Sequence, residues 1–452
     1  MRFADALDAT IAVPAENLDN LASKLPIPWI EQSMQCAGVA TVRKRRLDVQ
    51  QVIWLVLGMA LMRNRNIEEV VEKLDLALPS RSGKPMAQSS ISEARQHLGA
   101  DPVEYLFARS AAHWAQDMDP KFLWRGLSLY GVDGSTMAVA DTQANRKHFG
   151  GQNSGPDKIP SGYPIVRIVA LVNLRSRLLA DARIGPYVGS SELSLTDDIL
   201  ASVPDDSLFI ADRNFLTARV QRPLIKHGKR RHFLMRAKIT TVMEPIQSLG
   251  KNDCLVELLT TPEERKEDPT LGKTWIARAI RYQMPGHEPQ FLLTSLLDAK
   301  AYPAAELIGL YHERWDLELG FAEIKTTTLE QRPALRSKLP TTTEQEVWGI
   351  LLAYNLVRLE MASLAEAAGV MPNRISYIAA LHLIRDEWLW SALTSPGALP
   401  ARMRDLRAAI SHYILPPRRP KRAYPREVKK RTKPYPARKV AKTKEQSATG
   451  VA

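Results

Sequence analysis

The chain has 452 residues, with 62 lysines and arginines against 49 acidic residues and a formal net charge of +13. This length predicts two or three domains with a substantial core. A content of 45% hydrophobic and 25% charged residues excludes a wholly disordered chain. The two cysteines, Cys36 and Cys254, are too few for a disulfide framework and too far apart for a C-x-x-C metal site. These features predict a reduced, cytoplasmic protein.

No segment is typical of a membrane span. The longest apolar run, at 52–62, has 11 residues, whereas about 18 are needed to cross a bilayer. The N-terminus carries acidic residues early and lacks the charged-then-apolar layout of a signal peptide. We therefore expect no association with a membrane.

Most of the positive charge lies at the C-terminal end. Residues 416–452 contain 13 lysines and arginines against only Glu427 and Glu445, so this tail carries +11 of the +13. Because the tail has almost nothing to bury, we expect it to be disordered from about residue 416. It either adds non-specific DNA affinity through counterion release or is a charged end without a role, and both interpretations stay open.

The N-terminal third is predicted to be helical. Ser90 and Glu93 have the spacing of a capping box, and Asp101 followed by Pro102 is typical of a helix start. Together with the basic run at 43–46, these helices predict either a helix-turn-helix DNA-binding unit or a helical bundle with a solvated basic face. The pattern favours neither.

From about residue 127 the pattern becomes that of a mixed α/β sheet. Five apolar runs have strand character, at 127–133, 165–174, 178–185, 207–212 and 232–237. Helices are predicted between them at 193–202 and 217–227. Four further β-runs follow, which we interpret as an all-β insert, at 240–246, 253–260, 274–284 and 290–297. Helix returns at Pro303 and continues in several segments to about residue 393.

Two acidic residues follow buried strands of this predicted sheet. Asp133 comes after the apolar run 129–132, and Asp212 comes after 208–211. A carboxylate just past the end of a buried strand is held rigidly while still reaching solvent, and two of them on neighbouring strands are suited to hard cations such as Mg²⁺. Each also has a purely structural interpretation, because Asp-Gly-Ser and Asp-Arg-Asn are ordinary turn sequences.

A third acidic residue lies in a helical pattern with a more specific arrangement. At about 100° per residue, Tyr311, Arg314, Glu318 and Lys325 lie within an arc of about 60° on one helix. An apolar stripe flanks them, made of Leu310, Leu317, Phe321 and Ile324. The other acids of this segment point elsewhere, namely Glu313, Asp316 and Glu323. Such a helix directs one carboxylate, two cations and one phenol along one edge, which suits a metal ligand among phosphate contacts.

The spacing Tyr-x2-Arg-x3-Glu-x6-Lys resembles the YREK signature of the DDE transposases of bacterial insertion sequences, in the insertion element 4 family. The sequences around Asp133 (VDGS) and Asp212 (ADRNF) resemble those of the first and second acids of the family's triad, with Glu318 as the third. The N-terminal third is similar to the family's N-terminal domain. The resemblance covers roughly residues 1–395 and leaves out the basic tail.

The resemblance implies an α/β fold, with a ribonuclease H-like catalytic core interrupted by a β-rich insert. The implied organisation is a helical N-terminal DNA-binding domain, two parts of the core on either side of the insert, and a basic C-terminal extension. The N-terminal domain would span residues 1–120, and the two parts of the core would span 121–238 and 299–395. The insert would span 239–298 and the C-terminal extension 396–452.

The resemblance also implies a cut-and-paste transposase. In such enzymes two Mg²⁺ ions, for which Mn²⁺ can substitute, hold the attacking and leaving oxygens of a phosphoryl displacement. Asp133 would bridge the ions, with Asp212 and Glu318 each completing one site. Tyr311, Arg314 and Lys325 would contact phosphates near the element's end. The implied partners are double-stranded DNA, both the terminal inverted repeats and the target, and a second copy of the chain in a synaptic complex at the bacterial nucleoid.

Several expectations stay open at this point. Related transposases flip a terminal base onto an aromatic side chain of the insert; Trp275 is the nominal candidate here, with packing in the sheet as the structural alternative. No G-x-x-x-x-G-K-[ST] motif is present, so ATP is not implied. Two other functions remain: a metal-dependent nuclease without strand transfer, and a non-catalytic DNA-binding protein derived from a transposase.

Overall fold

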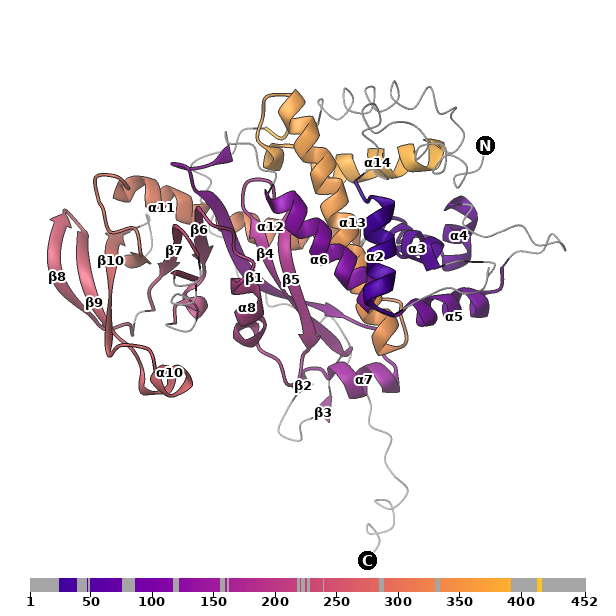
Figure 1. Ribbon diagram of the computed structural model, residues 1–452, viewed down its shortest axis with the longest axis horizontal. Helices are drawn as coiled ribbons and strands as arrows, with labels where there is room; N and C mark the ends of the chain where they lie inside the picture. The colour runs from indigo at the N-terminus through magenta and orange to yellow at the C-terminus, as the bar shows by residue number, and fades with distance from the viewer. Residues whose placement is uncertain are drawn as a thin grey trace, which may run out of the picture.

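The computed structural model shows a mixed sheet with helices packed on it (Figure 1). It describes residues 24–38, 47, 49–74, 86–116, 122–154, 159–160, 162–217, 220, 224–225, 228–238, 240–283, 288–329, 334–391 and 413–416. The predictions for the basic run at 43–46, for the tail beyond 416 and for most of the helix at 217–227 lie outside these residues.

Nine strands of the described chain form one continuous sheet. They are β1 (Ser128–Ala138), β4 (Ile165–Asn173), β5 (Leu179–Pro186), β6 (Ser207–Ala211), β7 (Arg231–Arg236), β8 (Met243–Gly250), β9 (Asp253–Leu259), β10 (Thr274–Tyr282) and β11 (Gln290–Thr294). Their order is β5-β4-β1-β6-β7-β11-β10-β9-β8. Two short strands, β2 (Asn153–Ser154) and β3 (Ile159–Pro160), form a separate pair.

Five adjacent strands, β5-β4-β1-β6-β7, have the order and directions of a ribonuclease H-like core. β1, β4 and β5 form an antiparallel meander, whereas β6 pairs parallel with β1 and β7 pairs parallel with β6. The predicted insert does not form a sheet of its own. Its strands pair antiparallel in succession from β11, and β11 pairs with β7, so they extend the core sheet.

The helices precede, interrupt and follow this sheet along the chain. Those before it are α2 (Ile27–Cys36), α3 (Val49–Leu61), α4 (Ile67–Leu74), α5 (Gln88–Leu98) and α6 (Asp101–Gln116). Within it lie α7 (Gln143–Phe149), α8 (Glu192–Leu200), the 3-10 turn η3 (Arg213–Phe215) and α10 (Pro262–Glu267). Those after it are α11 (Ala304–His312), α12 (Trp315–Ala322), the π-helix η4 (Glu323–Thr328), α13 (Pro340–Ala367), the turn η5 (Pro372–Arg374) and α14 (Tyr377–Ser391).

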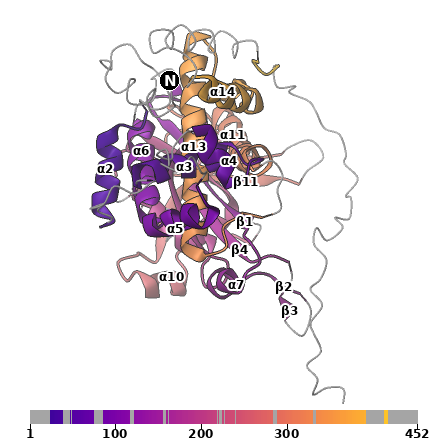
Figure 2. The same ribbon diagram turned by 90° about the vertical axis from the view of Figure 1, so that its right-hand side faces the viewer.

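The long helix α13 joins the N-terminal helices to the sheet (Figure 2). It contacts the N-terminal helices α3 and α6 as well as the strand β5. A Cβ added at Gly349 would lie 2.3 Å from Val56 Cγ1, so this glycine allows α3 to approach closely. By length and composition α13 is apolar enough to cross a membrane, but its most apolar window is 83% buried inside the molecule, as in a core helix.

Several details differ from the sequence-based expectations. The capping box at Ser90 does not form, because α5 begins at Gln88 with Ala87 as a cap without a side-chain hydrogen bond. The insert is not all-β, since a true capping box at Thr261 starts the short helix α10. Helix α3 is buried along almost its whole length, so it is a core helix without a free face for a DNA groove. The helix start at Asp101 is confirmed.

Gly131 in β1 determines how closely α12 approaches the sheet. A Cβ at this position would lie 2.9 Å from both Leu317 Cδ1 and the carbonyl oxygen of Ile210. Since overpacking a dense core typically costs about 1–3 kcal/mol, we expect Gly131→Ala to lower the free energy of unfolding by about that amount in urea titrations. Gly309 in α11 is the matched control, because nothing lies within 4 Å of its Cβ position. Gly309→Ala should be neutral or stabilising, and equal losses in both variants would contradict this role of Gly131.

Candidate active site

The register of the sheet brings two of the predicted acids together. The parallel pairing of β1 with β6 ends at Val132 opposite Ala211, so Asp133 and Asp212 are the next residues on neighbouring strands. The prediction that Asp133 follows the end of its strand is wrong. β1 continues to Ala138 because it stays paired with β4, in which Ala170 lies opposite Asp133. Asp133 therefore lies inside a strand, at the point where the parallel ladder stops.

Both acids belong to the face of the sheet that α12 covers. Leu129 of β1 packs in the same core cluster as Leu317 of α12, whereas Val132 and Ala211 pack in the cluster on the opposite face. Because side chains alternate along a strand, Asp133 and Asp212 lie on the α12 face. The contact between Leu317 and Gly131 places the start of α12 two residues along β1 from Asp133.

The segment with the YREK spacing is helical but not continuous. α11 ends at His312 and α12 begins at Trp315, with a turn at 313–314 between them. The predicted apolar stripe is confirmed, since all four of its members are buried, namely Leu310, Leu317, Phe321 and Ile324. The other acids point elsewhere, as predicted: Glu313 pairs with Arg175, and both Asp316 and Glu323 pair with Arg177.

The four residues of the spacing lie around the two sheet acids. Arg314 donates a hydrogen bond to the Glu318 carboxylate over 3.1 Å, and the Glu318 side chain is 42% exposed. Asp133 lies close enough to Arg314 and Glu318 for their charges to affect its pKa, and the charge of Asp133 affects the pKa of Lys325. The charges of Arg314 and Asp212 affect the pKa of Tyr311.

Burial dominates the electrostatics of this site. It raises the pKa of Asp133 to about 6, and the nearby carboxylates of Glu192 and Glu318 act in the same direction. The amide of Gly134, which donates to Asp133 Oδ1 over 2.8 Å, and the charge of Arg314 oppose this shift. Burial also lowers the pKa of Lys325 and raises that of Tyr311. Asp133 is thus a carboxylate whose charge is only partly balanced by its protein neighbours.

Such a carboxylate is chemically suited to a cation, but the three acids do not form a finished cage. Among the described residues, no group of three or more histidine, cysteine, aspartate and glutamate side chains is arranged to hold a metal ion. Glu318 is engaged with Arg314 instead. The donor set consists of carboxylate oxygens, which hard divalent cations prefer, and Glu318 would have to release Arg314 in order to join it.

The register adds a residue that we did not predict. Met235 lies opposite Ala211 in the parallel pairing of β6 with β7, so Arg236 lies next to Asp212 at the same edge. Burial raises the pKa of Tyr311, and the charge of Arg236 partly opposes that rise. The signal in the sequence is the one that identified the two acids, a first polar residue after an apolar strand.

The candidate Trp275 and Trp315 of α12 have different surroundings. Trp275 packs edge-on against Phe233, with ring centroids 6.1 Å apart, and contributes to the core on the opposite face of the sheet. This position agrees with the structural alternative for Trp275. Trp315, which precedes Glu318 by one helical turn, is 57% exposed, and Leu319 beside it is 43% exposed.

Comparison with known proteins gives consistent results. The insertion element 4 transposase N-terminal model matches residues 15–108, and the transposase DDE domain model matches residues 124–356. The chain is 36% identical over 421 residues to the transposase InsG for insertion sequence element IS4 of Escherichia coli (strain K12), with 93% of each chain covered. It is 34% identical over 236 residues to the putative transposase InsZ of the same organism, with 52% of this chain and 77% of that one covered.

Among solved structures, a piggyBac transposase synaptic complex with hairpin DNA aligns with 93% of this chain and 86% of its own, at a TM-score of 0.42 and 10% identity. That likeness is too distant to carry an argument. The two family models and the relative that is similar over nearly its whole length are sufficient, and the strand order of the core agrees with them. The chain belongs to the insertion element 4 family of DDE transposases.

Proposed function

We propose that this transposase cuts the ends of its own insertion element and joins the freed 3′-OH groups to target DNA, with Asp133, Asp212 and Glu318 as the carboxylates that hold Mg²⁺. The register of β1 and β6 supports this proposal most directly, because it makes Asp133 and Asp212 neighbours on the face covered by α12. Glu318 of α12 lies close enough to Asp133 for its charge to raise the pKa of Asp133.

The proposed chemistry consists of two phosphoryl transfers. In the first, water attacks the phosphorus at the element's end, the P–O3′ bond breaks and the 3′ oxygen takes up a proton. In the second, that 3′-OH attacks a target phosphate and displaces a target 3′ oxygen. Bound Mg²⁺ would stabilise the charge that develops on the attacking and leaving oxygens. The role of Asp133 and Asp212 is to hold the cation in place, since Asp133 lies within β1 and Asp212 directly follows β6.

We assign phosphate binding to Tyr311, Arg314 and Lys325, and the geometry adds Arg236. Arg314 now neutralises Glu318 over 3.1 Å. A DNA phosphate could accept two hydrogen bonds from Arg314 in place of the single one that Glu318 accepts, and release of Arg314 would free Glu318 for the cation. This exchange links correct docking of the end to completion of the site.

The remaining parts of the chain have simpler proposed roles. The helical N-terminal region recognises the element's ends, and among its described helices α5 exposes a polar face made of Gln88, Ser89, Ser90, Glu93, Gln96 and His97. Two copies of the chain act together, because two ends must be cut and joined. This reaction takes place in the cytoplasm, at the nucleoid. The basic tail, with 13 cationic side chains, adds sequence-independent affinity for DNA.

We expect Lys325→Ala to weaken binding of element-end DNA in EDTA and to reduce the steepness of its salt dependence. Loss of one phosphate contact should lower the slope of log K against log salt by about 1. Fluorescence anisotropy at several salt concentrations measures both quantities. Lys325→Arg is the matched control, since it keeps the charge and should restore the slope. An unchanged slope in Lys325→Ala would contradict a phosphate contact.

The proposal as a whole is tested on a supercoiled plasmid that carries the gene's own flanking ends. We expect cutting at the ends with Mg²⁺ but not with EDTA, followed by joined products when target DNA is present. Cutting without joined products would favour the nuclease. End binding without any cutting would leave a DNA-binding protein.

A further inference from the structure

The helix that carries Glu318 and Lys325 is anchored from behind by a buried cluster of charges. Its back carries Asp316 and Glu323, and each of these acids lies two residues before a proposed site residue. Two residues turn a helix by about 200°, so the anchored acids and the site residues lie on roughly opposite sides. The pairs 316/318 and 323/325 therefore repeat one arrangement at two successive points along the helix.

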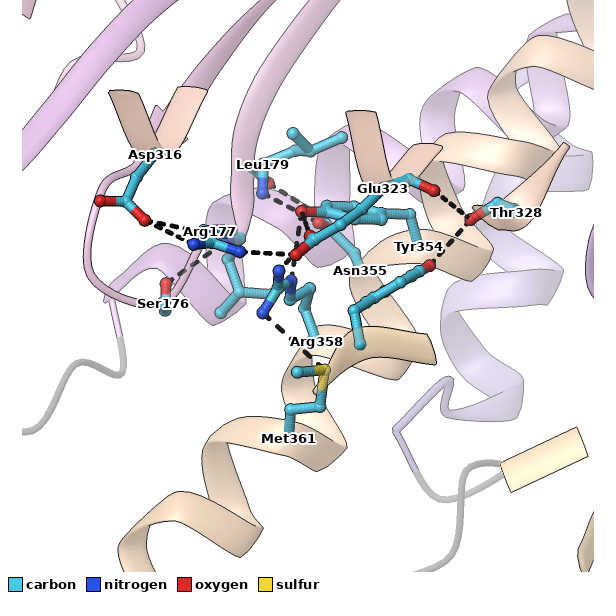
Figure 3. Close-up of polar contacts among 12 residues, drawn as sticks. Ser176, Arg177, Leu179, Asp316, Glu323, Thr328, Tyr354, Asn355, Arg358 and Met361 are labelled. Carbon is cyan, nitrogen blue, oxygen red and sulfur yellow. Dashed lines mark hydrogen bonds and ion pairs between the residues drawn. The ribbon is translucent and has the colours of Figure 1, made fainter. Parts of the chain in front are cut away.

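Two arginines from other parts of the chain hold these acids (Figure 3). Arg177 donates to Asp316 Oδ1 over 2.6 and 2.9 Å and to Glu323 Oε1 over 2.5 Å. Arg358 of α13 pairs with the other Glu323 oxygen. That oxygen also accepts from the Tyr354 hydroxyl over 3.1 Å. Two cations and two anions balance, so the cluster carries no net charge.

The surroundings indicate that this cluster forms at a cost. The side chains of Arg177 and Arg358 are 5% and 0% exposed, and burying charges is unfavourable unless they are fully paired. Arg177 adopts a left-handed backbone with φ of 60°, which is uncommon and strained for a residue other than glycine. Burial would lower the pKa of Arg358, but Tyr354 and Glu323 raise it overall, so the guanidinium stays charged.

The anchored end is also the irregular part of the helix. Glu323 is the first residue of the π-helix η4, which contains Lys325. Thr328 at the end of η4 donates to the Glu323 carbonyl over 3.3 Å and lies 2.9 Å from the Tyr377 hydroxyl. Single π-turns are uncommon and occur frequently at functional sites. In this chain, Glu323 is the residue at which the regular helix changes to the turn that presents Lys325.

We propose that Glu323 is a positioning residue for Lys325 and Glu318. Its pairing with Arg358, Arg177 and Tyr354 sets the placement of these two side chains in the proposed active site. This inference rests on the proposed site. Since misplacement of a reacting group by about 1 Å costs on the order of 100-fold in rate, Glu323→Gln should reduce end cleavage by about 10- to 100-fold. It should also weaken end binding in EDTA to the level of Lys325→Ala.

The matched control is another carboxylate that pairs with a buried arginine. Asp253 in β9 receives hydrogen bonds of 2.8 and 2.6 Å from Arg278, whose side chain is 0% exposed. Asp253→Asn makes the same chemical change as Glu323→Gln without touching α12 or η4. Both variants should lose stability in thermal melts. At a temperature where both are fully folded, Asp253→Asn should bind and cut within about twofold of wild type.

A double-mutant cycle distinguishes a specific effect of Glu323 on the position of Lys325 from a general loss of stability. If Glu323 acts through Lys325, adding Glu323→Gln to Lys325→Ala weakens end binding in EDTA by no more than about twofold. Independent losses that multiply would overturn the proposal, and so would equal losses in Glu323→Gln and Asp253→Asn. Wild-type binding and cleavage by Glu323→Gln would overturn it as well.

A milder variant covers the case in which Glu323→Gln does not fold. Tyr354→Phe removes only the hydroxyl that donates to Glu323, and we expect about 3- to 10-fold slower cleavage with the same dependence on Lys325. An unchanged rate would count against the proposal. Glu318→Gln is measured alongside: if it still cuts, the proposed site is wrong, whereas its inactivity together with full activity of Glu323→Gln rejects only the role of Glu323.

Discussion

Glu318→Gln is expected to abolish end cleavage while leaving DNA binding intact. An amide oxygen carries no charge, so the site would lose one of the three carboxylates that we assign to Mg²⁺. Stabilisation by a metal contributes several kcal/mol at the transition state, and about 4 kcal/mol corresponds to roughly a thousandfold in rate. Cleavage of a labelled end duplex, measured under single-turnover conditions with saturating protein, reports this step separately from binding.

Glu313→Gln provides the matched comparison on the same segment. Glu313 is an acid five residues earlier that faces away from the site and pairs with Arg175. We expect its conversion to glutamine to change the cleavage rate by less than about threefold, because its carboxylate pairs with Arg175 and is not one of the three that we assign to Mg²⁺. Comparable inactivation of both variants would show that net charge on this segment matters, and not the carboxylate of Glu318.

Asp133→Asn should have two effects of opposite sign. It should reduce cleavage by about a thousandfold for the same reason as Glu318→Gln. It should also make the metal-free protein more stable, because burial disfavours the charged form of Asp133 and raises its pKa to about 6 from an ordinary value of 3.8. A gain in stability combined with loss of activity is typical of a residue retained for function, whereas a purely structural Asp133 would lose stability.

The pH dependence follows from the direction of this shift. The folded protein holds the Asp133 proton more tightly than the unfolded chain does. The loss of stability caused by burying the Asp133 charge is therefore absent below about pH 4, grows between about pH 4 and 6, and is constant above that range. At pH 7.5 the shift corresponds to at most about 3 kcal/mol. Urea unfolding in EDTA should therefore show the stability gain of Asp133→Asn at pH 7.5 and its decline toward zero near pH 4. A gain independent of pH would contradict burial of the charge as its cause.

The sequence was informative about elements and local spacing. The alternating and apolar runs predicted the core strands closely, and helical periodicity identified the stripe of Leu310, Leu317, Phe321 and Ile324 that the structure buries. Both signals are local, because they depend on a repeat of two or of 3.6 residues. The YREK spacing was visible for the same reason.

The remaining features depend on pairing across long distances. The continuation of β1 beyond Asp133 depends on β4, and the proximity of Arg236 to Asp212 depends on the register of β6 with β7. The pairing of Arg177 with Asp316 joins residues 139 positions apart. No local repeat encodes such contacts. The break at 313–314 was also missed, since residues 310–319 around it contain no proline or glycine that would signal it.

The close packing of α3 on α13 has a consequence for how such proteins diversify. Residues of α3 and of β1 belong to one continuous hydrophobic core, so the N-terminal third, to which we assign end recognition, is not a detachable module. A change of element ends then has to occur by substitution on exposed side chains, such as those of α5. Exchange of the whole N-terminal region between relatives would place a different helix against α13 at Gly349, where only a close fit to Val56 is accommodated. We infer that in this protein the specificity for ends and the catalytic core evolve together.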